Sequence, residues 1–387
     1  MWNFDSPRIV FGEGALDVLE ELQGERALIV TDPTMVELGL VDRVKAYLDN
    51  ADIEVHLFAE VEPDPAVPTV LRGAEVAREV EPDWIIAVGG GSPIDAAKAI
   101  WVLYENPDVE PAAISPVMEL ELRKKARMIA IPTTSGTGSE ATFGIVLTDP
   151  EEQRKMGLGH RENLVDIAIV DPEMAAGMPP RLTADTGLDA LTHAVEGYTC
   201  TWRNDLTDGL CLSAVRLIFR YLPRAVADGS DMEARERMHN AATCAGLGFG
   251  NAMAAMAHAM GHALGGVFHL PHGRAVALFL PYTIEFVASE EPERFAELAA
   301  FIGCSSEGGK EAARELANSI RDLMREVGSP VSVAETGIER GAYEAQLDKL
   351  MDDAFNDTQM LTTVRAPSDE ELRQLFLYAY EGRPVDF

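Results

Sequence analysis

Residues 84–100 read WIIAVGGGSPIDAAKAI and combine three signals in one short stretch. An unbroken apolar run is followed by three glycines, and apolar residues then recur at helical spacing. This order predicts a buried strand over Trp84–Val88, a glycine loop, and a helix over Pro93–Leu103. A strand, a tight loop and a helix in succession are typical of a domain built around a parallel sheet.

The same alternation extends in both directions from this stretch. Apolar or β-branched runs predict further strands, and the segment Val67–Val80 has the period of a helix. From about Thr183 onward, Ala, Leu, Met, Glu and Arg dominate with three-and-four apolar spacing, which predicts helices only. We therefore expect an α/β domain with a Rossmann-like parallel sheet over residues 1–180 and an all-α domain over residues 181–387. The further strands are expected at Arg26–Thr31, Glu54–Phe58, Met128–Ile131 and Ile167–Val170.

Two loops rich in small residues follow predicted strands. Gly89, Gly90, Gly91 and Ser92 form the first, and residues 132–140 (PTTSGTGSE) form the second. Glycines let the backbone approach a phosphate, and the helix that follows offers unpaired N–H groups. A single glycine triplet is equally well explained as an ordinary turn, but two such loops at one sheet edge favour a dinucleotide. Neither loop has the GxGxxG spacing.

Asp32 ends the strand LIVTD and has two interpretations. Its carboxylate could accept a hydrogen bond from an adenosine ribose hydroxyl, which would favour NAD, because a 2′-phosphate would meet a like charge. Asp32 could equally be the N-cap of the helix that begins after Pro33.

Six of the eight histidines lie between positions 193 and 272. Asp189 and His193 are four residues apart, as are His258 and His262, so each pair would share one face of a helix. A single histidine is more often a hydrogen-bonded core residue, but the group favours a site for a first-row divalent metal. Spacing leaves open which of His258, His262, His269 and His272 are ligands.

The composition limits the partners of the chain. Its formal charge is −32, with seven lysines against twenty-five arginines. Such a field repels nucleic acid and anionic membranes, and it suggests a high-salt cytoplasm, although an ordinary acidic enzyme is the alternative.

Neither a signal segment nor a membrane span is evident, so we expect a cytoplasmic protein. The four cysteines lack CxxC spacing and are expected to be buried thiols.

The chain resembles the iron-dependent (group III) alcohol dehydrogenases, and within that family it is most similar to lactaldehyde reductases and short-chain alcohol dehydrogenases. The resemblance runs from Phe11 almost to the C-terminus and rests on four motifs in the family's order. These are residues 89–100 (GGGSPIDAAKAI), 132–140 (PTTSGTGSE), 177–198 (GMPPRLTADTGLDALTHAVEGY) and the run from His258 to Gly273.

The resemblance implies a hydride transfer between NAD or NADP and a small primary alcohol or aldehyde, with a divalent metal between the two domains. Iron is the family's metal, and manganese or zinc would also fit the ligands. His262 matches a family histidine near the nicotinamide and is expected to pass a proton to solvent. The implied metal ligands are Asp189, His193, His258 and His272. The implied cofactor contacts are Asp32, Gly89, Gly90, Gly91, Ser92, Asp95, Thr133, Thr134 and Lys155.

Three alternatives stay open at this point. A lyase of the dehydroquinate synthase type shares the architecture but needs a basic pocket, which seven lysines make difficult to build. A glycerol dehydrogenase would bind its metal with fewer histidines. A non-catalytic nucleotide or metal sensor would keep the glycines without needing His262. We also expect a homodimer or a higher homo-oligomer, whose self-repulsion salt would screen.

Overall fold

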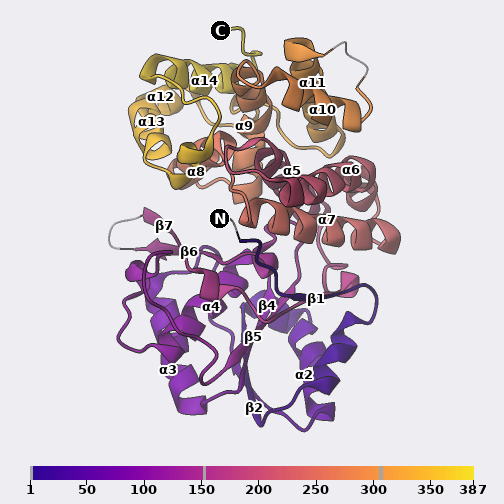
Figure 1. The fold of residues 1–387 in the computed structure, drawn as a ribbon, viewed down its shortest axis with the longest axis vertical. Coiled ribbons are helices and arrows are strands. Elements are labelled where there is room, and N and C mark those ends of the chain that lie inside the picture. Colours follow the sequence, from indigo (N-terminus) through magenta and orange to yellow (C-terminus); the bar gives the residue numbers. More distant parts are fainter. Residues whose placement is uncertain (1–2, 151–153, 305–307) are drawn as a thin grey trace. The chain divides into compact units, whose positions relative to one another are not determined.

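The computed structural model describes residues 3–150, 154–304 and 308–387. The chain divides into two compact units, residues 1–178 and 179–387, where the sequence suggested a boundary after residue 180. Figure 1 colours the α/β unit from indigo to magenta and the helical unit from magenta to yellow.

A parallel sheet forms the centre of the first unit. In the described residues six strands join it, in the order β1-β8-β5-β4-β2-β3. All five predicted strands are present, and β5 is one residue longer at each end than predicted. The bounds are β1 (Arg8–Phe11), β2 (Arg26–Thr31), β3 (Glu54–Phe58), β4 (Trp84–Gly89), β5 (Arg127–Pro132) and β8 (Ile167–Val170).

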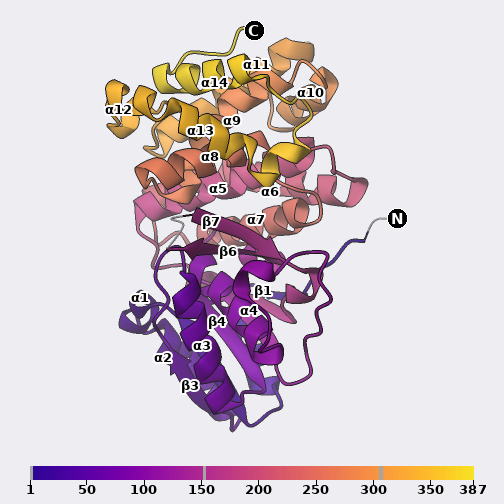
Figure 2. The same cartoon turned by 90° about the vertical axis from the view of Figure 1, so that its left-hand side faces the viewer.

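Helices cover both faces of this sheet, as the unbroken apolar strands require. Along β2, Leu28 and Val30 pack with α3 and α4, whereas Ala27 and Ile29 face the opposite way and pack with η1 and α2. Figure 2 shows α3 and α4 in front of the strands. The helical segments of the unit are η1 (Ala15–Glu21), α1 (Pro33–Glu37), α2 (Leu40–Asn50), α3 (Val67–Val80), α4 (Gly91–Glu105), η2 (Pro111–Ala113), η3 (Ser139–Ala141), η4 (Arg161–Asn163) and η5 (Pro172–Met174).

The strand order reverses direction at β2. The chain passes from β2 to β3 on one side and then crosses to β4 on the other side. In open α/β sheets, ligands bind beyond the carboxyl ends of the two strands at such a switch point. Here these ends carry Asp32 and the glycine loop that begins at Gly89.

Sequence reasoning missed two features of this unit. The edge strand β1 is one. The other is an antiparallel hairpin of β6 (Gly144–Asp149) and β7 (Arg154–Gly159). The hairpin is tied to the start of α3, since Thr148 N donates a hydrogen bond to Pro65 O at 2.8 Å.

The second unit is helical, as predicted; every regular element among its described residues is a helix. A single large apolar core runs through it. None of the helices in the described ranges is both long and apolar enough to cross a bilayer. The elements are α5 (Pro180–Thr199), α6 (Asp205–Ala227), α7 (Met232–Gly250), α8 (Met256–Phe268), α9 (His272–Val287), α10 (Pro292–Phe301), α11 (Gly309–Glu326), η6 (Ala334–Thr336), α12 (Arg340–Ala345), α13 (Leu347–Phe355), η7 (Thr358–Thr362) and α14 (Asp369–Glu381).

The expectation of four buried thiols is wrong for two of them. Cys200 and Cys211 are buried, but Cys244 and Cys304 are only partly buried. Cys304 lies just beyond the last turn of α10 and packs against the apolar core of the second unit.

Candidate functional site

Four side chains from three helices of the second unit converge on one point. Asp189 and His193 lie one turn apart on α5, His258 lies in the first turn of α8, and His272 is the first residue of α9. Asp189 Oδ1 is 3.8 Å from His193 Nδ1, 3.8 Å from His258 Nε2 and 3.4 Å from His272 Nε2. One ligand atom from each residue lies within 4.8 Å of all the others.

The polar atoms at this point suit a bound cation. Asp189 Oδ1, His193 Nδ1 and His258 Nε2 are buried, and none has a hydrogen-bond partner among the described residues. Leaving such atoms unpaired costs free energy. A divalent first-row metal would satisfy them together, since imidazole nitrogen and carboxylate oxygen are its usual ligands.

Two members of the cluster, Asp189 and His193, have strongly shifted pKa values. Burial alone would raise the pKa of the Asp189 carboxyl, but His193 and His272 outweigh burial and hold this pKa below its ordinary value. Burial lowers the pKa of His193 well below its ordinary value. A metal binds an ionised carboxylate and a neutral imidazole, and at Asp189 and His193 the two shifts favour these forms.

Glu196, which sequence reasoning did not single out, orients His258. The carboxylate of Glu196 lies 2.5 Å from His258 Nδ1 and accepts hydrogen bonds from the N–H groups of Ala255 and Ala257 at the start of α8. When Nδ1 donates to Glu196, the lone pair of Nε2 is left facing Asp189. Burial lowers the pKa of His258, but Glu196 more than offsets this and raises it above the ordinary value.

The rings of His193, His262 and His269 lie in three different environments. The ring of His193 stacks on Phe249 of α7 at a centroid distance of 3.9 Å, a contact that sequence reasoning missed. His262 packs beside His272 at 5.2 Å, but its Nδ1 lies 2.7 Å from Asp357 Oδ2. His269 is exposed in a left-handed conformation at the end of α8, outside the cluster.

Two glycines let the three helices approach this closely. A Cβ on Gly273 would lie 2.2 Å from Asp185 O and 2.9 Å from Asp189 Cβ, and a Cβ on Gly261 would lie 2.6 Å from the Cα of Val276. Any side chain at these positions would push α9 away from α5 and α8. The glycines therefore help to bring His272 within reach of Asp189.

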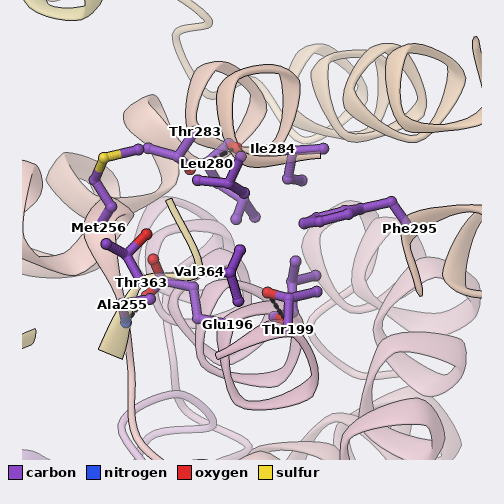
Figure 3. A pocket seen from close by; sticks show the side chains of 12 residues that line it. Glu196, Thr199, Ala255, Met256, Leu280, Thr283, Ile284, Phe295, Thr363 and Val364 are labelled. Carbon is purple, nitrogen blue, oxygen red and sulfur yellow. Dashed lines mark hydrogen bonds between the residues drawn. The ribbon is translucent and has the colours of Figure 1, made fainter. Parts of the chain in front are cut away.

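A small cavity lies beside Glu196, within the core of the second unit. Figure 3 shows Glu196 together with Leu280, Ile284 and Phe295 around it. Its volume is about 20 Å³, enough for a water molecule but not for an alcohol with several carbons. None of the four clustered residues lines it, so this cavity does not mark the substrate site.

In the first unit, the two glycine loops lie side by side. Gly89 ends β4 opposite Pro132 of β5, and Thr133 N donates to Gly89 O at 2.9 Å. Gly89 has φ +154°, and a Cβ there would lie 2.4 Å from Pro93, so this position requires glycine. The hydroxyl of Thr133 is buried and has no hydrogen-bond partner in the described part of the chain. This is expected of a group that hydrogen-bonds to a ligand.

Asp32 is the N-cap of α1. Its Oδ1 accepts hydrogen bonds from Thr34 N at 2.8 Å and from Met35 N at 3.2 Å. The second of its two interpretations therefore describes its contacts within the chain. The cap also holds the carboxylate at the carboxyl end of β2, next to the strand that carries the Gly89 loop.

Asp95 and the unpredicted Lys98 tie α4 to the second loop. Ser139 Oγ donates to Asp95 Oδ1 at 2.5 Å, and Val146 N donates to Asp95 Oδ2 at 2.9 Å. The fully buried Lys98 donates from Nζ to Ser139 O, Ser139 Oγ and Gly144 O at 2.7, 3.0 and 2.9 Å. Burial lowers the pKa of Lys98 to about 8. Both side chains thus shape the loop that would hold the dinucleotide.

Lys155 reaches the first loop through Asp64. Its Nζ lies 2.6 Å from Asp64 Oδ1, and Asp64 N donates to Ser92 Oγ at 3.2 Å. Lys155 and Ser92, both expected to contact the cofactor, therefore meet the same residue. Ser92 belongs to the first turn of α4, whose N-terminus attracts anions.

Replacing Lys98 tests how much this arrangement matters. Lys98→Met removes two hydrogen bonds to the second loop and one to Gly144 of β6, so we expect NADH and NADPH to bind roughly tenfold more weakly or worse, with the metal content unchanged. Fluorescence titration of the folded protein measures this. Lys45→Met, which removes an exposed lysine paired with Asp49, is the control. Equal binding by the two variants would contradict a role for Lys98 in shaping the loop.

Comparison with known proteins decides the family. A model described as iron-containing alcohol dehydrogenase matches residues 6–172, and one described as the C-terminal part of the Fe-containing alcohol dehydrogenase family matches residues 183–380. The chain belongs to the iron-containing alcohol dehydrogenase family. The predicted resemblance and enzyme class are thereby confirmed, and the lyase and sensor alternatives fall away.

Relatives within this family match the whole chain. The NADPH-dependent butanol dehydrogenase of Clostridium saccharobutylicum is 42% identical, and the match covers 100% of both chains. A solved 1,3-propanediol oxidoreductase is 36% identical with a TM-score of 0.92, covering 98% of this chain and 100% of that one. A halo-thermophilic archaeal alcohol dehydrogenase from a Red Sea brine pool is 30% identical with a TM-score of 0.89, covering 98% of each chain.

Proposed function

We propose that this iron-containing alcohol dehydrogenase family member transfers a hydride between NAD(P) and small primary alcohols or aldehydes, with its metal held by Asp189, His193, His258 and His272. The convergence of these four ligand atoms, three of them buried and unpaired, carries the proposal. The two glycine loops, one at the switch point after β4 and the other after the adjacent strand β5, support dinucleotide binding.

The substrate class is inferred from relatives. One is named a butanol dehydrogenase, one a 1,3-propanediol oxidoreductase and a third, 36% identical, a 1-propanol dehydrogenase. These names support primary alcohols of the size of propanol and butanol, or the corresponding aldehydes, as substrates.

The residues of the cluster and those beside it have different roles in the proposed reaction. When bound, a divalent cation supplies a Lewis acid for the substrate oxygen, and the dinucleotide accepts or supplies the hydride. Glu196 holds His258 in the tautomer that presents Nε2, and Phe249 holds the ring of His193. His262, whose Nδ1 faces Asp357, has its Nε2 left to exchange a proton with the substrate hydroxyl.

Coenzyme choice involves opposing indications. The Asp32 carboxylate, fixed by its cap at the end of β2, would repel a 2′-phosphate and disfavour NADP. The butanol dehydrogenase relative is named as NADPH-dependent. We propose that the enzyme accepts either dinucleotide, with Asp32 disfavouring NADP.

The charge of the chain suggests its environment. A net charge of −32 and the halo-thermophilic relative support activity in a salt-rich cytoplasm, where screening would also allow a dimer or higher homo-oligomer. Size-exclusion chromatography at low and high salt tests the assembly, and a monomer at every salt concentration would exclude it.

One set of initial rates tests the proposed function. We expect short primary alcohols to reduce NAD or NADP only after metal-stripped protein is reloaded with Fe²⁺, Mn²⁺ or Zn²⁺, and the rate to rise with salt. Absence of reduction with every alcohol, metal and coenzyme would reject the proposal.

A further inference from the structure

A buried ion pair joins α5 to α9 next to the metal cluster. Arg274 Nε donates to Asp185 Oδ1 at 3.0 Å, and Arg274 Nη2 donates to Asp185 Oδ2 at 2.6 Å. Each residue is 7% exposed. A bidentate pair of this kind fixes the orientation of both partners as well as their separation.

The position of this pair relates it to two of the proposed ligands. Asp185 lies one helical turn before Asp189 on α5, and Arg274 lies two residues after His272 on α9. Between them, Gly273 approaches the backbone of Asp185 so closely that no side chain would fit. The first turn of α9 is therefore held directly against α5 at the level of the cluster.

The position of the His272 side chain depends on this first turn of α9. His272 begins α9, and at 36% side-chain exposure it is the least buried member of the cluster. The rings of His193 and His258 are held by Phe249 and Glu196, within the packed interior. The ring of His272 packs beside His262, and the start of α9 sets how closely it approaches Asp189.

We propose that Asp185 and Arg274 are positioning residues that set the approach of His272 to Asp189 and thereby the affinity of the site for a divalent metal. This inference rests on the proposed function, because it takes the cluster to be a metal site. Partners that orient ligands typically change metal affinity by about 10- to 100-fold when they are removed.

Arg274→Met tests this proposal, because positioning and electrostatics predict opposite changes in metal affinity. Removing a cation beside the site would, by electrostatics alone, strengthen the binding of a divalent cation. If the pair positions His272, affinity falls instead. We expect Zn²⁺ to bind about 10- to 100-fold more weakly in competition with a chromophoric chelator, Arg274→Lys to be intermediate, and the absorption spectrum of bound Co²⁺ to change.

Arg321→Met is the matched control. Arg321 forms a second buried bidentate pair, with Glu285 near the other end of α9, at 2.7 and 2.9 Å. Both Arg→Met variants leave a buried carboxylate without its cation, although Val385 N still donates to Glu285, and both should lower the melting temperature of the metal-free protein. Only Arg274→Met should weaken the binding of Zn²⁺.

Two further variants separate the possible failures. The double variant Asp185→Asn/Arg274→Met should bind Zn²⁺ no more weakly than whichever of its two single variants has the lower affinity. This follows because the two residues act as one unit. If Arg274→Met binds Zn²⁺ as tightly as the unmodified protein while His272→Ala does not, the positioning role is wrong and the metal site stands. If His272→Ala also binds Zn²⁺ normally, the proposed metal site itself is wrong.

Discussion

His193→Ala is expected to abolish both metal binding and alcohol oxidation. His193 Nδ1 is buried and unpaired 3.8 Å from Asp189 Oδ1, so its loss removes one of four ligands and leaves a cavity beside Phe249. We expect less than about a tenth of an ion per chain by elemental analysis, and turnover reduced by about 10³-fold or more, as for the loss of an essential electrostatic group.

His269→Asn provides the control for this prediction. His269 is exposed at the left-handed end of α8, and asparagine tolerates that conformation. The variant should keep its metal and its rate. Full turnover by a metal-free His193→Ala protein would show that the cluster does not serve the reaction.

His262→Ala is expected to separate metal binding from catalysis. Its Nδ1 faces Asp357 at 2.7 Å, and it lies outside the set of four atoms that converge. The variant should therefore bind metal normally while kcat falls by about 10²- to 10⁴-fold, the usual contribution of a positioned proton-transfer group. Steady-state kinetics on fully loaded protein measures this loss.

Asp357→Asn serves as the companion to His262→Ala. It keeps a hydrogen-bonding group opposite His262 and should lose less activity than His262→Ala. A His262→Ala enzyme with normal metal content and an unchanged kcat would remove the proton-transfer role.

The buried part of the sheet could be predicted because its strands are strongly patterned. The central residues of β2, β4 and β8 are apolar and are covered on both faces of the sheet. Such unbroken apolar runs favour a buried strand. β1 was missed because it has four residues, with exposed ends at an edge of the sheet. The hairpin strand β7, RKMGLG, contains two glycines and lacks β-branched residues, so it carries no local strand signal.

The site was predictable only to the level of residue type and spacing. Spacing placed His258 and His262 on one face of α8, but it could not decide between them as ligands. The resemblance to the family separated them, and the structure adds a contact that spacing does not show: Asp357, distant in sequence, lies 2.7 Å from His262 Nδ1. Glu196 and Arg274 read as ordinary charged residues, since only the folded chain shows that Glu196 is buried against His258 and Arg274 against Asp185.

The most direct test of the metal-centred account is to titrate the stripped protein with Fe²⁺ and follow both bound metal and alcohol-dependent NAD(P) reduction. We expect activity to rise in proportion to bound metal, to reach its maximum at one ion per chain and not to rise in His193→Ala. Full activity before any metal is added, or the same recovery in His193→Ala, would contradict this expectation.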